Sequence, residues 1–278
     1  MKISPRYDSP TIVYIEGGPA EQLVPVTRQR LRMEAMLTGL TEDQWSMPSR
    51  CDGWTVRDVV AHLGGVNSFW SASIRAGLSG TPSRWLVGFD PADTPAEMVG
   101  ALSDVASTTV FERFVASNDE LLGLFAELSV EQWEMMSESP AGHVPIRLLA
   151  HHALWDSWVH ERDIALPLGI APGAEADEIR SVLQYAAVIG PALGLILGRT
   201  EVTGFLAIEA TDPRLHLVIE VGDSVRLGDG CPPAGTPFLC GSAVELVEAL
   251  SVRIPLPDAA PTLWRDAVAG IAAAFDVG

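Results

Sequence analysis

The stretch that decides the fold is Cys51-Asp-Gly-Trp54-Thr-Val-Arg-Asp-Val-Val-Ala-His62-Leu63, which leads from a loop into a helix. Thr55 suits a helix N-cap, and Asp58 follows three residues later, as in a capping box with the shorter acid. Apolar residues then recur at three- and four-residue spacing, which predicts a helix over residues 55–76. The same spacing predicts helices over residues 20–40, 94–128 and 145–166.

The predicted helix over residues 94–128 has a start signal of its own. Thr94 offers an N-cap, Pro95 occupies the first helical position, and Glu97 supplies the returning acid of a capping box. We therefore expect one long helix that begins at Thr94.

An internal repeat relates two parts of this helical region. Leu40-Thr-Glu-Asp-Gln-Trp45-Ser-Met47 resembles Leu128-Ser-Val-Glu-Gln-Trp133-Glu-Met135, and each stretch is followed by a glycine and then by an Ala-His pair that ends at His62 or His151. Shared capping chemistry would explain the first match alone. The coincident Ala-His endings favour duplicated helix-loop-helix halves, which would pack together as one antiparallel four-helix bundle.

The last third of the chain changes to short alternating runs. Residues 204–210 and 215–221 read as neighbouring strands joined by a turn, and helices over residues 242–250 and 261–275 would cover one face of their sheet. This pattern predicts a small α+β unit. The expected organisation is an N-terminal extension, a helical bundle and a C-terminal α+β domain, over residues 1–18, 19–198 and 199–278.

Composition limits the partners. The chain has 18 basic and 36 acidic residues, a formal charge of −18, and its single lysine is Lys2. Nucleic acids and anionic membrane surfaces attract clustered Lys and Arg, so neither partner is expected. The remaining basic residues are arginines, whose forked donors suit an acidic small molecule.

Other features indicate a cytoplasmic protein. The N-terminal residues lack the pattern of a signal peptide. The chain contains three cysteines without CxxC spacing, which predicts reduced thiols rather than a disulfide framework. Residues 181–198 carry no charge, but a glutamine, a proline and glycines within them favour a buried helix over a membrane span.

A candidate metal site lies on the helix over residues 145–166. His152, Asp156 and His160 are spaced one turn apart and share one stripe. Asp156 and His160 can reach one cation, and His62 from the first half would supply a third ligand. Three ligands leave a coordination position open, as in catalytic zinc sites, although nickel, iron or manganese also suit this donor set. The alternative is that these histidines are hydrogen-bonded core residues.

Two neighbours extend this candidate site. Asp163 lies near the same stripe, where it would orient a ligand imidazole through its other nitrogen. Trp155 is the tryptophan closest to the ligand stripe and would help to form the wall of a pocket that binds a cofactor. Most of the other tryptophans are expected in the core.

These residues resemble a known family. The stretch from Leu40 through Cys51-Asp-Gly-Trp54 to His62, together with Val159-His160-Glu-Arg-Asp163-Ile-Ala-Leu-Pro-Leu-Gly169, is similar to the mycothiol-dependent maleylpyruvate isomerase family of DinB-like metal-binding bundles. Residues 239–253 resemble the small sterol-carrier-like domain that ends its members. The resemblance places the metal ligands at His62, Asp156 and His160, with aspartate where the family usually has glutamate.

The resemblance implies an enzyme that uses a divalent metal, usually zinc, to bind a low-molecular-weight thiol such as mycothiol as thiolate. The thiolate would add to a small electrophilic, anionic substrate, giving cis-trans isomerisation or S-transfer. Arg84 and Arg253 are the candidate catalytic residues that would hold the substrate carboxylate. A non-catalytic binding protein and a metal-dependent hydrolase remain alternatives, and the chain is expected to be a monomer or a homodimer.

Overall fold

The computed structural model describes residues 2–7, 10–198 and 202–275. Its N-terminal part is a bundle of four long helices, α1 (Leu23–Thr38), α3 (Val56–Leu78), α5 (Ser107–Glu127) and α6 (Ile146–Ala165). Within the bundle α3 packs against α5 and α6, and α1 packs against α5 and α6. Short elements connect the long helices: α2 (Glu42–Trp45), α4 (Asp93–Gly100), the 3₁₀ helix η1 (Gln132–Glu134) and the hairpin β2 (Met136–Ser139) and β3 (Gly142–Pro145).

The two predicted halves share local structure at their starts. Thr41 caps α2 through a capping box with Gln44, and Ser129 exchanges the same two hydrogen bonds with Gln132 at η1. Beyond each Trp-x-Met turn, the first residue of the following long helix donates its backbone N–H to the methionine carbonyl, at 2.9 Å in both halves. The duplication itself stays a prediction, but these paired contacts agree with it.

The predicted cap at Thr55 is confirmed. Its hydroxyl accepts from the backbone N–H of Asp58, and the Asp58 carboxylate accepts from the backbone N–H of Thr55. These two bonds satisfy N–H groups that the first helical turn leaves without partners. The cap therefore fixes where α3 begins, and with it the position of His62 two turns later.

The prediction of one helix over residues 94–128 is wrong. Helix α4 begins at Asp93 without a side-chain cap, because the Thr94 hydroxyl accepts from the backbone N–H of Asp90. The chain leaves helical geometry after Gly100 and begins α5 at Ser107. Arg57 of α3 stabilises the non-helical segment between α4 and α5, because its Nε donates to the Val105 carbonyl at 3.0 Å. Hydrophobic spacing cannot reveal such a contact between distant residues.

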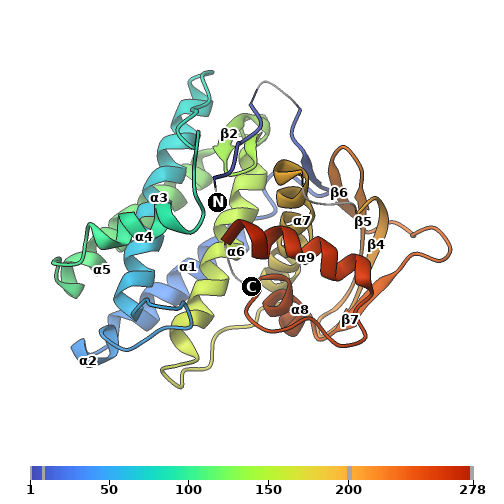
Figure 1. Ribbon diagram of the computed structural model, residues 1–278. Helices are drawn as coiled ribbons and strands as arrows, with labels where there is room; N and C mark the ends of the chain where they lie inside the picture. Colours follow the sequence, from blue (N-terminus) through green and yellow to red (C-terminus); the bar gives the residue numbers. More distant parts are fainter. Residues whose placement is uncertain (1, 8–9, 199–201, 276–278) are drawn as a thin grey trace.

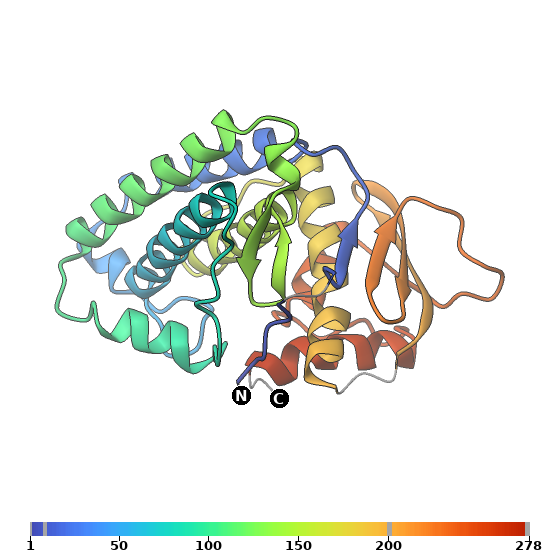
Figure 2. The same ribbon diagram turned by 90° about the horizontal axis from the view of Figure 1, so that it is seen from above.

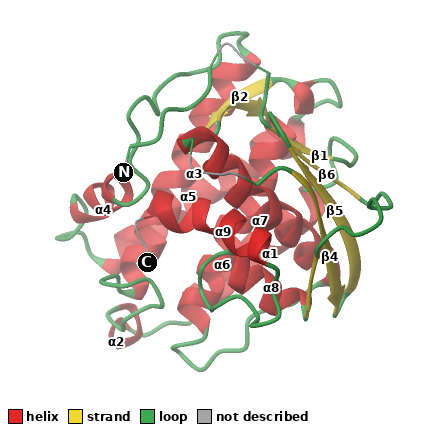
Figure 3. Ribbon diagram, turned by 45° about the vertical axis from the view of Figure 1, so that its right-hand side comes forward, coloured by secondary structure: helices red, strands yellow, loops and turns green. Residues whose placement is uncertain are grey.

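The C-terminal part is a five-stranded mixed sheet with strand order β1-β6-β5-β4-β7. The predicted hairpin is confirmed as β4 (Gly204–Thr211) paired antiparallel with β5 (Arg214–Val221). Strand β6 (Val225–Gly228) continues the antiparallel order, whereas β7 (Phe238–Gly241) pairs parallel with β4. Helices α7 (Ala176–Leu197), α8 (Ala243–Leu250) and α9 (Thr262–Phe275) lie on one face, and the other face points outward (Figure 3).

Two elements tie the predicted segments together. Strand β1 (Val13–Ile15), from the N-terminal extension, pairs parallel with β6 and so completes the C-terminal sheet. Helix α7 lies between the bundle and the sheet, in contact with α1 and α6 on one side and with β5, β6, α8 and α9 on the other (Figures 1 and 2). The boundaries at residues 18 and 198 therefore stay a prediction.

Helix α7 is long and apolar enough to cross a membrane, but 83% of its apolar window is buried inside the fold. This burial confirms the sequence-based prediction of a core helix. Close packing depends on glycine: a Cβ at Gly270 of α9 would lie 2.3 Å from the Gly190 carbonyl oxygen and 2.8 Å from the Gly194 backbone nitrogen. The two helix backbones can approach this closely only because residue 270 has no side chain.

Gly270→Ala is therefore expected to destabilise the protein, by roughly 1–3 kcal/mol, because the helices must separate. The matched control is Gly123→Ala on the exposed face of α5, where a Cβ meets nothing within 4 Å. There alanine should stabilise by about 0.5–1 kcal/mol, since it is the better helix former. Urea unfolding measures both changes, and equal midpoints for the two variants would contradict the packing argument.

Candidate metal centre

The structure brings together the three predicted ligands. His62 comes from α3, and Asp156 and His160 come from α6. Nε2 of His62 lies 3.8 Å from Oδ1 of Asp156, and Nε2 of His160 lies 3.5 Å from the same oxygen. The two imidazole rings meet edge to face with centroids 5.1 Å apart. One potential ligand atom from each residue thus lies within 4.8 Å of the others.

The surroundings of Asp156 test whether a cation fits. Its Oδ2 is buried and has no hydrogen-bond partner among the described residues, a costly state for a carboxylate oxygen. A bound cation would satisfy it, and two imidazole nitrogens with a carboxylate form a donor set that zinc and similar divalent ions accept. The three side chains keep 10–13% of their surface exposed, so a small ligand can still approach.

Electrostatics also favour positive charge at this position. Burial alone would raise the pKa of Asp156, but the neighbouring His62 and His160 side chains hold it well below its usual range. Burial would lower the pKa of His160, yet the Cys51 sulfur and the carboxylates of Asp163 and Asp156 raise it to about 10. The site therefore stabilises positive charge next to an ionised carboxylate; without a metal that charge is a proton on His160, which a divalent ion would displace on binding.

A carboxylate and an arginine lie next to the Nδ1 side of the His160 ring, away from the nitrogen that faces Asp156. Nδ1 of His160 lies 3.0 Å from Oδ2 of Asp163, the contact expected for a residue that orients a ligand imidazole. Asp163 is fully buried and accepts from Nε and Nη2 of Arg253 at 3.0 and 2.9 Å. Nε2 of His160 is thereby left to face Asp156. Arg253 lies beyond α8, so the C-terminal part reaches the candidate centre through this pair.

Sequence reasoning missed Cys51. Its Sγ lies 3.3 Å from Oδ2 of Asp163 and 3.6 Å from Nδ1 of His160, and these three residues form a second group with the spacing of metal ligands. Arg253 is in contact with Asp163 and with the sulfur, and its positive charge would repel a cation there. Hydrogen bonding explains this second group better than metal binding. Its position gave a signal in the sequence, because Cys51 is the first residue of the stretch that leads to His62.

Aromatic side chains surround His152, one turn before Asp156. Rings of Trp70, Trp155 and Tyr185 lie 4.9, 5.6 and 5.1 Å from its ring. The Tyr185 hydroxyl lies 2.8 Å from Nδ1 of His152, and burial lowers the pKa of this histidine to about 4. Trp155 is buried and donates from Nε1 to the Ser251 hydroxyl at 2.9 Å. Contact of Trp155 with a bound thiol stays a prediction.

The two candidate arginines occupy different settings. Arg253 is engaged by Asp163 beside His160, as described above. Arg84 is exposed, in the loop after the C-terminal end of α3, and its guanidinium lies 5.3 Å from the centre of the Tyr7 ring. Glu138 fastens this loop by accepting from the backbone N–H groups of Trp85 and Leu86. Because His62 is near the opposite end of α3, the structure does not bring Arg84 together with the three ligands.

Comparison with known proteins decides the family. Residues 26–165 match the sequence model of the mycothiol maleylpyruvate isomerase N-terminal domain. The chain belongs to this family. Membership confirms the resemblance seen in the sequence and supports an enzyme of the isomerase or transferase type. No curated protein matched the chain.

Two crystal structures show the same fold. One is a mycothiol-dependent maleylpyruvate isomerase, with a TM-score of 0.61 and 16% sequence identity, and the other is its histidine-to-alanine mutant, with values of 0.60 and 15%. Each alignment covers 86% of this chain and 90% of the crystallised chain. The shared architecture therefore extends from the isomerase-family bundle into the C-terminal α+β part and confirms the predicted fold class.

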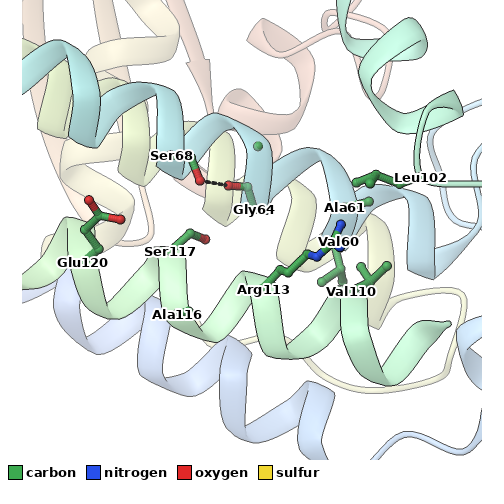
Figure 4. Close-up of a pocket in the computed structure, with 11 residues that line it drawn as sticks. Val60, Ala61, Gly64, Ser68, Leu102, Val110, Arg113, Ala116, Ser117 and Glu120 are labelled. Atoms are coloured by element: carbon green, nitrogen blue, oxygen red, sulfur yellow. Dashed lines mark hydrogen bonds between the residues drawn. The ribbon is translucent and has the colours of Figure 1, made fainter. Parts of the chain in front are cut away.

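A groove lies elsewhere on this isomerase-family bundle, between α3 and α5 (Figure 4). From α3 it is lined by Val60, Gly64 and Ser68, and from α5 by Arg113 and Glu120, among others. None of the three candidate ligands lines it, because His62 points from α3 toward α6. The groove and the candidate metal centre therefore occupy different faces of α3.

His151 holds the place in the second half that His62 holds in the first, but it is a core residue. Its Nε2 lies 3.0 Å from the Gln22 amide and its Nδ1 lies 3.2 Å from the Ser181 hydroxyl. Burial lowers the pKa of His151 from 6.5 to about 3. The predicted repeat therefore matches His151 with His62 in sequence position but not in surroundings.

This shift predicts a pH dependence of stability in the metal-free protein. As the pH falls below 6.5, the unfolded chain takes up a proton at residue 151 that the folded chain does not, so the free energy of unfolding falls toward pH 3. His151→Gln should therefore lose about 2 kcal/mol less than the unchanged chain between pH 7 and pH 5. Urea unfolding at the two pH values measures the difference, and identical losses would refute it.

Proposed function

We propose that the protein is a metal-dependent enzyme that uses a low-molecular-weight thiol, such as mycothiol. Its substrate would be a small electrophilic acid, which the enzyme either isomerises from cis to trans or joins to the sulfur of the thiol. The observation that carries this proposal is the convergence of His62, Asp156 and His160, together with the buried Oδ2 of Asp156, which has no hydrogen-bond partner among the described residues. Membership of the mycothiol maleylpyruvate isomerase family supports the choice of thiol and reaction class.

His62, Asp156 and His160 would hold the ion, most simply Zn²⁺. A divalent ion at this position would lower the pKa of a coordinating thiol, so that the nucleophile is ionised near neutral pH. Asp163 keeps the His160 ring oriented through its 3.0 Å contact with Nδ1. The aromatic rings around His152 would exclude water from the neighbouring space and offer a surface to the carbon skeleton of the bound molecules.

The acid of the substrate needs a positive partner. Arg253 is the better placed of the two candidate arginines, because its guanidinium already lies beside Cys51 and Asp163 at the candidate centre. Arg84 would take part only from the exposed loop after α3. Location in the cytoplasm, independence from nucleic acids and membranes, and a monomeric or dimeric state belong to this proposal as well.

Metal analysis and a cobalt-substituted protein test the proposal. The purified chain should contain about one divalent ion, and His62→Ala and His160→Ala should lose it, because two remaining ligands bind weakly. His216→Ala is the matched control, since this histidine lies on β5, far from α3 and α6 in the fold. Full metal occupancy in both ligand variants would contradict the assignment.

The thiol is tested next. Adding mycothiol to the cobalt-substituted protein should change the visible spectrum, because sulfur replaces a weaker ligand at the open position. Conversion of maleylpyruvate in the presence of mycothiol, or a mycothiol conjugate of another electrophile, would then separate isomerase from S-transferase. An unchanged spectrum would contradict thiolate binding and leave hydrolysis or ligand storage as the explanation of the site.

A further inference from the structure

Arg30 of α1 is a completely buried cation beside the candidate metal centre. Its Nη1 donates to the Asn67 side-chain oxygen at 2.6 Å, and its Nη2 donates to the Ala153 carbonyl at 2.9 Å. Asn67 lies on α3 beyond His62, and Ala153 lies on α6 about one turn before Asp156. The guanidinium is therefore held between the two helices that carry the proposed ligands.

The charge of Arg30 is not neutralised by an ion pair in the described part of the chain. Both of its hydrogen-bond acceptors are neutral oxygens, and its buried Nε has no partner among the described residues. Burial lowers the pKa of Arg30 to about 10, and the carboxylate that opposes this effect is that of Asp156. The guanidinium is therefore still charged at neutral pH, although it is removed from solvent.

The second buried carboxylate near the centre, Asp163, already has arginine partners. It accepts three hydrogen bonds from Arg253, and Nε of Arg50 lies 3.7 Å from its Oδ1. With a divalent ion in place, Asp156 cancels one of its two charges, and Arg30 adds a further positive charge at the Ala153 carbonyl, one turn of α6 before Asp156. Charges interact strongly where water is excluded, so this arrangement leaves an excess of positive potential at the open coordination position.

We propose that Arg30 makes the open position of the metal centre selective for an anionic ligand, such as a thiolate, over a neutral one. This inference rests on the proposed function, because it assumes a divalent ion at His62, Asp156 and His160. It assigns to Arg30 a positioning role that acts through charge and not through contact with the substrate. If the role of Arg30 were only to connect α1 with α3 and α6, a neutral side chain with the same hydrogen bonds would leave ligand selectivity unchanged.

The experiment compares an anion with a neutral ligand in the cobalt-substituted protein. Thiocyanate and imidazole are titrated separately into the unchanged chain, Arg30→Met and Arg30→Lys, and binding is followed in the visible spectrum. Arg30→Met should weaken thiocyanate binding about tenfold, since it removes a nearby charge, while imidazole binding stays within about twofold. Arg30→Lys keeps the charge and should preserve the ratio of the two affinities.

Two further variants separate the effect of charge from misfolding and from general effects of removing an arginine. Arg30→Gln retains amide donors for Asn67 and Ala153 and should show the same loss of anion preference, so it replaces the methionine variant if that one does not fold. Arg147→Met is the matched control, because Arg147 lies at the start of α6 and donates to the Ile15 carbonyl at 2.7 Å. Its ratio of affinities should equal that of the unchanged chain.

The outcomes separate this inference from the proposed function. If cobalt binds and the ratio of thiocyanate to imidazole affinity is the same with and without Arg30, the inference is overturned while the metal centre stands. An equal loss of both affinities would likewise overturn it, because that result marks a purely structural role. If the unchanged chain binds no cobalt at residues 62, 156 and 160, the proposed function falls, and this inference falls with it.

Discussion

Asp156→Asn is expected to weaken metal binding by at least about a hundredfold and to reduce thiol-dependent activity in proportion. Asparagine keeps the size of the side chain but removes the negative charge, which leaves only neutral ligands from His62 and His160. In the present structure Oδ1 of Asp156 lies 3.8 and 3.5 Å from the two imidazole nitrogens, so the carboxylate is the charged centre of the group. Metal content after dialysis and cobalt titration measure the loss.

Asp156→Glu is the matched control, because it introduces the acid that the family resemblance implies at this position. The carboxylate is kept, and the extra methylene moves it away from the α6 backbone. Metal binding should stay within about tenfold of the unchanged chain, since charge and ligand type are both preserved. Full metal retention by the asparagine variant would show that residue 156 is not a ligand.

The helical part of the fold could be predicted where its determinants are local. Thr55 and Asp58 fix the start of α3 through contacts three residues apart, and the apolar spacing that follows is a property of one helix. The break between α4 and α5 escaped prediction because Arg57, from another helix, stabilises the non-helical carbonyl of Val105. Pairing of β1 with β6 escaped for the same reason, since Val13 and Val225 are far apart in the sequence.

In the candidate site, too, the contacts within one helix could be predicted and those between distant segments could not. Asp156, His160 and Asp163 lie on one helix, so the helical period alone placed their side chains on one stripe. Addition of His62 required the repeat or the family resemblance, because α3 and α6 are separate in sequence. The sequence could not show that Arg253 would meet Asp163, a contact between the end of α6 and the segment after α8.

Arg253→Met is expected to lower the free energy of unfolding by about 2 kcal/mol, because the buried Asp163 carboxylate loses the hydrogen bonds from Arg253 and keeps only Arg50, whose Nε lies 3.7 Å from Oδ1, as an arginine partner. The orienting contact between Asp163 and His160 remains, so metal affinity should change little.

Asp163→Asn should have a small effect on the free energy of unfolding and a large effect on metal affinity. Arg253 is partly exposed and can turn toward water, which limits the loss of stability, but the weaker acceptor at His160 should reduce metal affinity about 10- to 100-fold.

The double variant Asp163→Asn with Arg253→Met isolates the coupling between the two residues. With no charge left unpaired, its loss of stability should be smaller than the sum of the single losses, by about 1–3 kcal/mol. Urea unfolding of the metal-free proteins measures this cycle, and additive losses would show that the ion pair does not support the fold. A raised KM with unchanged stability in Arg253→Met would instead identify Arg253 as a direct holder of the substrate carboxylate, because a residue bound mainly to Asp163 must affect the fold when it is removed.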